Sequence, residues 1–169
     1  MPPATREVSR GALLLVVAAA TLPRLAVLVV EREEILEEFV EKSDRFARTL
    51  VESGTFGFLP DVPSAYTQPL YAFFLAALYW PFDRSWLVVG LAQTLVAVAT
   101  ALLVLEIGRR LHSTRVGVIA AVLATLHPYL VWQDVHDNRE ILDGLLLAAL
   151  TLVGLLAFER RSPAFGAAT

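Results

Sequence analysis

WLVVGLAQTLVAVATALLVLEI, residues 86–107, is the stretch that decides the fold. It carries a single charged side chain, Glu106, close to its end. A helix of roughly 20 apolar residues matches the thickness of the hydrocarbon core of a bilayer. Inside lipid every backbone N–H and C=O must be paired within the protein, and a helix pairs them by itself. This stretch therefore predicts a transmembrane helix.

Three further apolar blocks of similar length occupy residues 11–30, 116–133 and 141–158. Overall 56% of the residues are hydrophobic and the mean hydropathy is +0.60, above the usual composition of soluble domains. We therefore expect an all-α fold: a multi-span transmembrane helical bundle forming a single transmembrane domain over residues 1–169. Cysteine is absent, which excludes disulfides and thiolate metal sites. The net charge of -3 gives no reason to expect nucleic acid as a partner.

The charged residues alternate in sign between successive connections. Basic residues dominate before the first block, between the second and third blocks, and after the fourth block, whereas residues 31–84 and 134–140 are rich in acids. The positive-inside rule places the basic connections in the cytoplasm. The sequence predicts an integral, multi-pass protein of the cell membrane with a cytoplasmic N-terminus, and it places both acidic connections on the outer side.

The first block, residues 11–30, contains Pro23 and Arg24 near its middle. An arginine inside a membrane usually faces a protein interior or a wet cavity. The alternative is that Arg24 reaches an interface with its long side chain. A second alternative is that Arg6, Arg10 and the following alanine-rich run form a secretory signal peptide.

The outer connection, residues 31–85, is predicted to contain two surface helices. Residues 34–53 alternate apolar and charged positions at helical spacing, and Gly54 is a good stop signal. We expect this helix to lie along the bilayer with its apolar face toward the lipid. Residues 69–82 are apolar and aromatic but short for a span, which predicts an interfacial or re-entrant helix.

Two groups of polar residues could carry chemistry. Glu41, Asp44 and Arg48 share one face of the first surface helix, where a carboxylate could serve as a general base for a hydroxyl. In the second outer connection, His136, Asp137 and Glu140 could bind a divalent cation. The alternative for the second group is ordinary polar capping between two helices. No phosphate-binding loop, dinucleotide fingerprint or zinc-protease motif is present.

Several motifs then follow one another in a recognisable order. They are FARTLVESGTFGF at 46–58, PSAYTQPLY at 63–71, IGRRL at 107–111, HPY at 127–129 and REIL at 139–142. This order resembles the N-terminal part of the GT-C glycosyltransferases related to protein O-mannosyltransferases and to the bacterial aminoarabinose transferase. The resemblance extends over nearly the whole chain.

The resemblance implies a membrane glycosyltransferase. Such enzymes transfer a sugar from a polyprenyl-phosphate carrier to a hydroxyl acceptor on a protein, lipid or glycan at the non-cytoplasmic side. The position of the outer-loop acid in these enzymes corresponds here to Phe39 and Val40, which are not acids. Glu41 and Asp44 therefore become the candidates for the catalytic base. The candidate substrate-binding residues are Glu140, which matches the family's outer-loop glutamate, together with Arg48, Arg139, Tyr66 and Tyr71. A divalent cation is possible and its ligands are unknown.

The resemblance also implies more spans than this chain has. We therefore expect the N-terminal part of a longer enzyme, inactive alone, or a natural short relative. The alternatives are a non-catalytic membrane scaffold or assembly protein and a transporter fragment. The transferase hypothesis predicts that the two outer connections converge, with Glu41 or Asp44 approaching Glu140.

Overall fold

The computed structural model describes residues 8–37 and 42–166, and its regular structure over these ranges is helical, without strands. The helices are α1 Arg10–Glu31, α2 Glu34–Glu37, α3 Lys42–Ser53, α4 Pro69–Phe82, α5 Trp86–Leu111, α6 Thr114–Thr125, α7 Pro128–Gln133 and α8 Glu140–Gly166. The predicted all-α class is confirmed.

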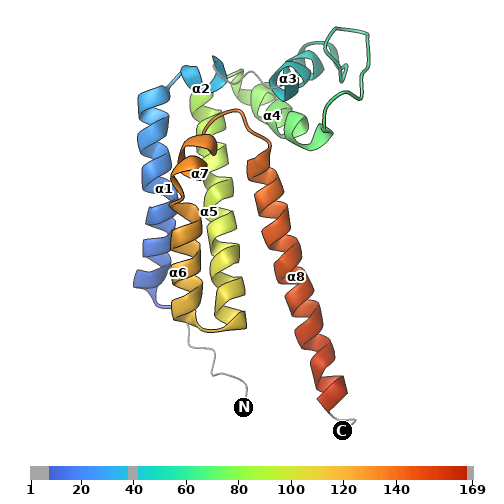
Figure 1. The fold of residues 1–169 in the computed structure, drawn as a ribbon. Coiled ribbons are helices and arrows are strands. Elements are labelled where there is room, and N and C mark those ends of the chain that lie inside the picture. Colours follow the sequence, from blue (N-terminus) through green and yellow to red (C-terminus); the bar gives the residue numbers. More distant parts are fainter. Residues whose placement is uncertain (1–7, 38–41, 167–169) are drawn as a thin grey trace.

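Within the described residues, three helices are long and apolar enough to cross a membrane. They are α1, α5 and the Glu140–Glu159 part of α8, with mean hydropathies of 2.5, 2.3 and 2.3. Figure 1 shows α1, α5 and α6 side by side, while α8 contacts α5 and diverges from the other helices along its length. Gly90 of α5 leaves room for Leu28 of α1, because a Cβ at position 90 would collide with the Leu28 side chain.

The third apolar block forms two helices instead of the one expected over residues 116–133. Helix α6 ends at Thr125, and α7 starts at Pro128. Proline lacks an N–H and disfavours the helical conformation of the residue before it, and His127 accordingly has an extended ψ of 121°. The break exposes the Thr125 carbonyl, which accepts a hydrogen bond from Arg24.

The first surface helix also differs from the expectation for residues 34–53. It consists of α2 and α3, with residues 38–41 outside the described ranges. The apolar side of α3 packs against α4, and Phe46 and Ala47 are fully buried. The expectation that this apolar stripe faces lipid is therefore wrong for α3, because the stripe faces protein. The predicted end of the helix is confirmed, because α3 ends at Ser53 and Gly54 has a φ of 72°.

The bundle has two ends of different character. The start of α1, the α5–α6 turn and the end of α8 lie together at one end, at the bottom of Figure 1. Helices α2, α3, α4 and α7 lie at the other end. The basic connection around Arg109, Arg110 and Arg115 is thereby separated from both acidic connections by the length of the helices.

Candidate functional site

Asp44, in the first turn of α3, is the most enclosed of the acids of the first connection whose side chains the structure describes. Its side chain is 1% exposed, and its Oδ1 accepts hydrogen bonds from the Tyr79 hydroxyl at 2.7 Å and from Arg84 Nε at 2.9 Å. Tyr79 comes from α4, and Arg84 lies in the short α4–α5 linker. Arg84 also donates to the Leu36 carbonyl at 2.7 Å, which ties the end of α2 to the same group. Asp44 is thus held by α4 and by the α4–α5 linker, and Arg84 connects both to α2.

Asp137, in the α7–α8 connection, brings the second acidic segment to the same place. It is 2% exposed, and its backbone N–H donates to the Ile35 carbonyl of α2 at 3.4 Å. The charge of Asp137 contributes to a higher pKa of Tyr71, of Tyr79 and of Arg84. The two connections therefore converge, as the transferase hypothesis predicted: the Asp137 backbone joins α2, while Glu140 lines a cavity with Arg24 and Asp134.

Asp44 and Asp137 contribute to raised pKa values of the neighbouring tyrosines and of Arg84. Burial, and secondly the charge of Asp137, raise the pKa of Tyr71 well above its ordinary value of 10.0. Burial, and secondly the charge of Asp44, raise the pKa of Tyr79. Burial alone would lower the pKa of Arg84, but the hydrogen bond and charge of Asp44 outweigh burial and raise it. Both tyrosines remain neutral hydrogen-bond donors, and Arg84 remains a cation.

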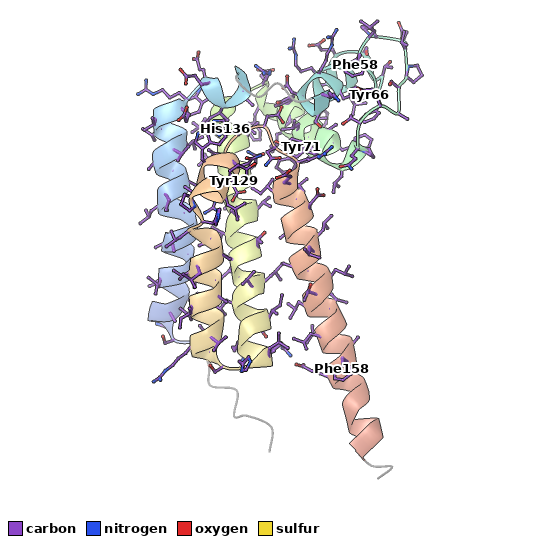
Figure 2. All side chains as sticks on the ribbon, in the orientation of Figure 1. Phe58, Tyr66, Tyr71, Tyr129, His136 and Phe158 are labelled. Atoms are coloured by element: carbon purple, nitrogen blue, oxygen red, sulfur yellow. The ribbon has the colours of Figure 1, made fainter. Side chains whose placement is uncertain are left out.

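Gln93 of α5 fixes the loop that carries Asp137. Its side chain is fully buried; Oε1 accepts from the Tyr71 hydroxyl at 2.6 Å, and Nε2 donates to the carbonyls of Asp134 at 3.1 Å and His136 at 2.9 Å. The Tyr71 hydroxyl in turn accepts from the backbone N–H of Asn138 at 3.0 Å. Figure 2 shows Tyr71 and His136 at the same end of the bundle.

Arg24 anchors the same loop from α1. It is 2% exposed, and its guanidinium donates to Asp134 Oδ2 at 2.5 and 3.0 Å and to the Ala20 carbonyl at 2.8 Å. It also donates to both oxygens of Thr125 at the α6–α7 break. The Arg24 side chain therefore faces the protein interior and does not extend to the membrane interface. These contacts hold the start of the second connection in place.

The remaining candidates lie around this centre. Glu140 is exposed in the first turn of α8 and lines, with Arg24 and Asp134, a cavity of about 120 Å³ between α5, α6 and α8. Arg139, just before α8, is half-buried. Glu41 lies outside the described residues. Within the part of the chain that is described, no group of three or more histidine, aspartate or glutamate side chains is arranged to hold a metal ion.

The last two candidates, Arg48 and Tyr66, lie on the outer side of α3. Both are exposed, and Tyr66 packs beside Phe58 with ring centroids 5.4 Å apart. A groove of about 410 Å³ runs along this side, which we call the α3 groove; its lining comprises Asp44, Arg45, Arg48, Thr49 and Glu52 of α3 and Phe58, Leu59 and Pro60 of the following loop. Asp44 is one of the residues that line this groove, although its side chain is 1% exposed.

Sequence reasoning missed Tyr79, Arg84 and Gln93. Tyr71 and Tyr79 are eight residues apart and so share one side of α4, and they are the hydroxyls of an otherwise apolar helix. Gln93 is a polar residue inside an apolar span, which by itself marks a candidate functional or structural position. Both signals were available in the sequence.

Comparison with known families gives one finding. The model of a family described as dolichyl-phosphate-mannose-protein mannosyltransferase matches residues 61–168, which is more than half of the chain. The chain belongs to this family. The match covers α4 to α8 and so includes Tyr71, Tyr79, Arg84 and Asp137, whereas Asp44 precedes it. No curated protein and no solved structure matches the chain.

Family membership makes the chain a membrane glycosyltransferase of the mannosyltransferase type, in agreement with the resemblance carried by the motifs. The three long apolar helices fit a membrane protein. A lipid-linked sugar donor and an acceptor are the partners that this family implies.

Proposed function

We propose that the protein transfers a sugar from a polyprenyl-phosphate carrier to a hydroxyl acceptor on the non-cytoplasmic side of the cell membrane, with Asp44 as the general base. The observation that supports this most is the binding of Asp44 by Tyr79 and Arg84 at the end of the bundle where the Asp137 segment joins α2. A buried acid paired with a cation, at the end of a membrane bundle, suits a reaction between a lipid donor and a water-borne acceptor.

The two carboxylate oxygens of Asp44 have different roles in the proposed reaction. Oδ1 is held by Tyr79 and Arg84, while Oδ2 has no hydrogen-bond partner among the described residues. Oδ2 takes the proton of the acceptor hydroxyl as its oxygen bonds to the anomeric carbon of the sugar. The bond from that carbon to the phosphate oxygen breaks, and polyprenyl phosphate leaves. A positioned base of this kind contributes about 10²–10⁴-fold to a rate.

The donor approaches from the bilayer side of the site. Arg84, with a side chain 32% exposed, is the cation next to Asp44, and we assign it to the phosphate of the donor. Arg139 and Glu140, at the head of α8, are the groups we assign to the donor headgroup, because Glu140 lines the cavity between α5, α6 and α8. Tyr71 holds the loop with Asp137 and so shapes the site from α4.

The side of the membrane follows from the charges. Arg109, Arg110 and Arg115 lie at the end of the bundle opposite Asp44. The positive-inside rule then assigns that end to the cytoplasm and the acidic end to the outside. A reporter enzyme that works only in the cytoplasm should be active when it is fused after Arg115. Activity at the same position of a reporter that works only outside the cytoplasm would reverse the assignment.

The activity is tested directly in proteoliposomes. The complete gene product, reconstituted with radiolabelled polyprenyl-phosphate mannose and a threonine-containing peptide, should yield labelled peptide. A parallel reaction with a polyprenyl-phosphate aminopentose compares the donor sugars, and an arm with EDTA measures any need for a divalent cation. Absence of transfer from every lipid donor to every hydroxyl acceptor would refute the proposed function.

A further inference from the structure

The basic end of the bundle, where α1 starts, α5 turns into α6 and α8 ends, contains two kinds of cation. Arg109 and Arg110 of α5 are paired, because both bind Glu106, at 2.7 and 2.6 Å. Arg10 of α1 and Arg115 of α6 are exposed, and neither forms an ion pair with a side chain that the structure describes. The unpaired arginines described at this end therefore belong to α1 and α6.

Helices α1 and α6 begin in the same way. Ser9 caps α1 and Ser113 caps α6, and each hydroxyl accepts a hydrogen bond from a backbone N–H of the first turn, at 3.2 and 3.3 Å. In both helices an arginine stands in that first turn, and neither first turn contains an acid. A cation is unfavourable there, because the helix dipole is positive at the start of a helix. An anion bound from outside the protein would offset this repulsion.

Apolar side chains continue from each arginine toward the middle of the bundle. On α1, Leu14 follows Arg10 by four residues and is 67% exposed. On α6, Ile119 and Leu123 follow Arg115 at intervals of four residues and are 58% and 69% exposed. Residues four apart lie on one face of a helix. Each helix therefore has a cation at the end of an apolar strip, an arrangement that fits an amphiphile with an anionic head.

Packing holds the two helix starts together. Val8, just before α1, and Val118 of α6 pack against one buried cluster that includes Leu105 of α5. Gly117 of α6 lies directly against the backbone of α5, because a Cβ at position 117 would fall 2.3 Å from the Leu105 carbonyl oxygen. Arg115, two residues before Gly117, is thereby kept at the end of the bundle.

We propose that the starts of α1 and α6 bind anionic phospholipids of the adjoining leaflet, with the headgroup phosphate at Arg10 and Arg115 and the acyl chains along Leu14, Ile119 and Leu123. A lipid fits better than a soluble phosphate because the exposed apolar strips adjoin the cations. The long apolar helices α1 and α5 bring this end to a bilayer surface. The inference is independent of the proposed transfer reaction, since Asp44 lies at the opposite end of the bundle.

The test measures the binding of fluorescent phosphatidylglycerol, and of phosphatidylcholine with the same acyl chains and label, to the whole chain in a neutral detergent. Each arginine near an anionic headgroup contributes about a fivefold factor in affinity, so phosphatidylglycerol should bind about 25-fold more tightly than phosphatidylcholine. The double variant Arg10→Gln/Arg115→Gln should lose most of this preference. Its affinity for phosphatidylcholine should stay at the wild-type value, because the apolar strips are intact.

The control is Arg32→Gln/Arg48→Gln, which removes the same charge from two exposed arginines at the opposite end and should keep the wild-type preference. Equal affinities for the two lipids in the wild type, or equal losses in the two double variants, would overturn the proposal. Glycerol phosphate at the concentration of the lipid should not compete, because it lacks acyl chains. Full displacement of the lipid by glycerol phosphate would assign the arginines to a soluble anion and would also overturn it.

Discussion

The two ends of the bundle both contain ion pairs, but they bury them to different degrees. At the end that we propose to lie outside, here named the outer end, Asp44 is 1% exposed and is bound by Tyr79 as well as by a cation. At the basic end Glu106 pairs with Arg109 and Arg110, and the side chains of the pairs there are between 18% and 40% exposed. The basic end has a charge pattern that suits orientation in a membrane, whereas the outer end contains carboxylates withdrawn from water.

This difference separates two uses of charge. Half-exposed pairs keep most of their hydration and add little to stability. Buried charges lose hydration and are tolerated only where hydrogen bonds replace it. Arg24 is such a case, because its guanidinium donates hydrogen bonds to Asp134, Ala20 and Thr125. The outer end therefore contains a hydrogen-bonded polar framework in which Asp44 Oδ2 has no hydrogen-bond partner among the described residues. Substitutions at the two ends test that contrast.

The largest effect is expected from Asp134→Leu, which leaves the Arg24 guanidinium buried without its counter-ion. Breaking a buried pair in this way costs about 3–5 kcal/mol. The free energy of unfolding, measured by denaturant titration in detergent micelles, should fall by that amount. The double variant Arg24→Met/Asp134→Leu should recover most of the loss, because it removes both charges. A double variant no more stable than Asp134→Leu alone would show that the pair is not the source of the effect.

The second effect concerns the loop that carries Asp137. Gln93→Leu removes the partners of the Tyr71 hydroxyl and of the Asp134 and His136 carbonyls. Each buried group left unsatisfied costs about 1–3 kcal/mol, and with partial relaxation we expect a total loss of about 2–3 kcal/mol. The matched control is Thr94→Val on the same helix, whose hydroxyl bonds only to the Gly90 carbonyl of its own helix. If both variants were equally stable, Gln93 would not hold the loop.

The sequence predicted the elements that are defined by local pattern. The apolar blocks gave α1, α5 and α8, the proline at position 69 gave the start of α4, and Gly54 gave the end of α3. His127 and Pro128 predict a kink in the third apolar block, but not two separate helices. The hydrogen bond that the break receives comes from Arg24, more than a hundred positions away along the chain. The partners of Asp44 were missed because Tyr79 and Arg84 meet it only through tertiary packing.

A smaller effect is expected from Tyr79→Phe, which removes one hydrogen bond to Asp44. Loss of a hydrogen bond to a charged group should lower the free energy of unfolding by about 1–2 kcal/mol at pH 7. Arg84 remains bound to the same carboxylate oxygen and limits the loss. The measurement is again denaturant titration, and a loss above that of Gln93→Leu would contradict the expected order of the two variants.

The same tyrosine gives the outer end a pH dependence. The pKa of Tyr79 is raised in the folded protein, so the folded state keeps a proton that the unfolded state loses above pH 10. Stability therefore falls as the pH rises above 10, by about 1.4 kcal/mol per pH unit for each such tyrosine. The slope should be smaller in Tyr79→Phe than in the wild type. Equal slopes in the two proteins would show that burial beside Asp44 does not keep the Tyr79 proton in place.

The smallest effect is expected at the basic end. Glu106→Gln removes the carboxylate between Arg109 and Arg110, where the side chains are partly hydrated. The loss should stay below about 1 kcal/mol and should diminish further at high salt. A loss that equals that of Asp134→Leu would remove the distinction between the two ends.

The central claim, that the outer end carries the chemistry through Asp44, is tested most directly by the rate of sugar transfer in Asp44→Asn. Asparagine keeps the size of the side chain and an oxygen for Tyr79 and Arg84, but it cannot take up the proton of an acceptor. Transfer from a polyprenyl-phosphate sugar, measured beside wild type and Glu106→Gln, should fall by at least about 100-fold in Asp44→Asn. Glu106→Gln should retain the wild-type rate. A rate for Asp44→Asn within about tenfold of wild type, well short of the contribution of a general base, would contradict the claim.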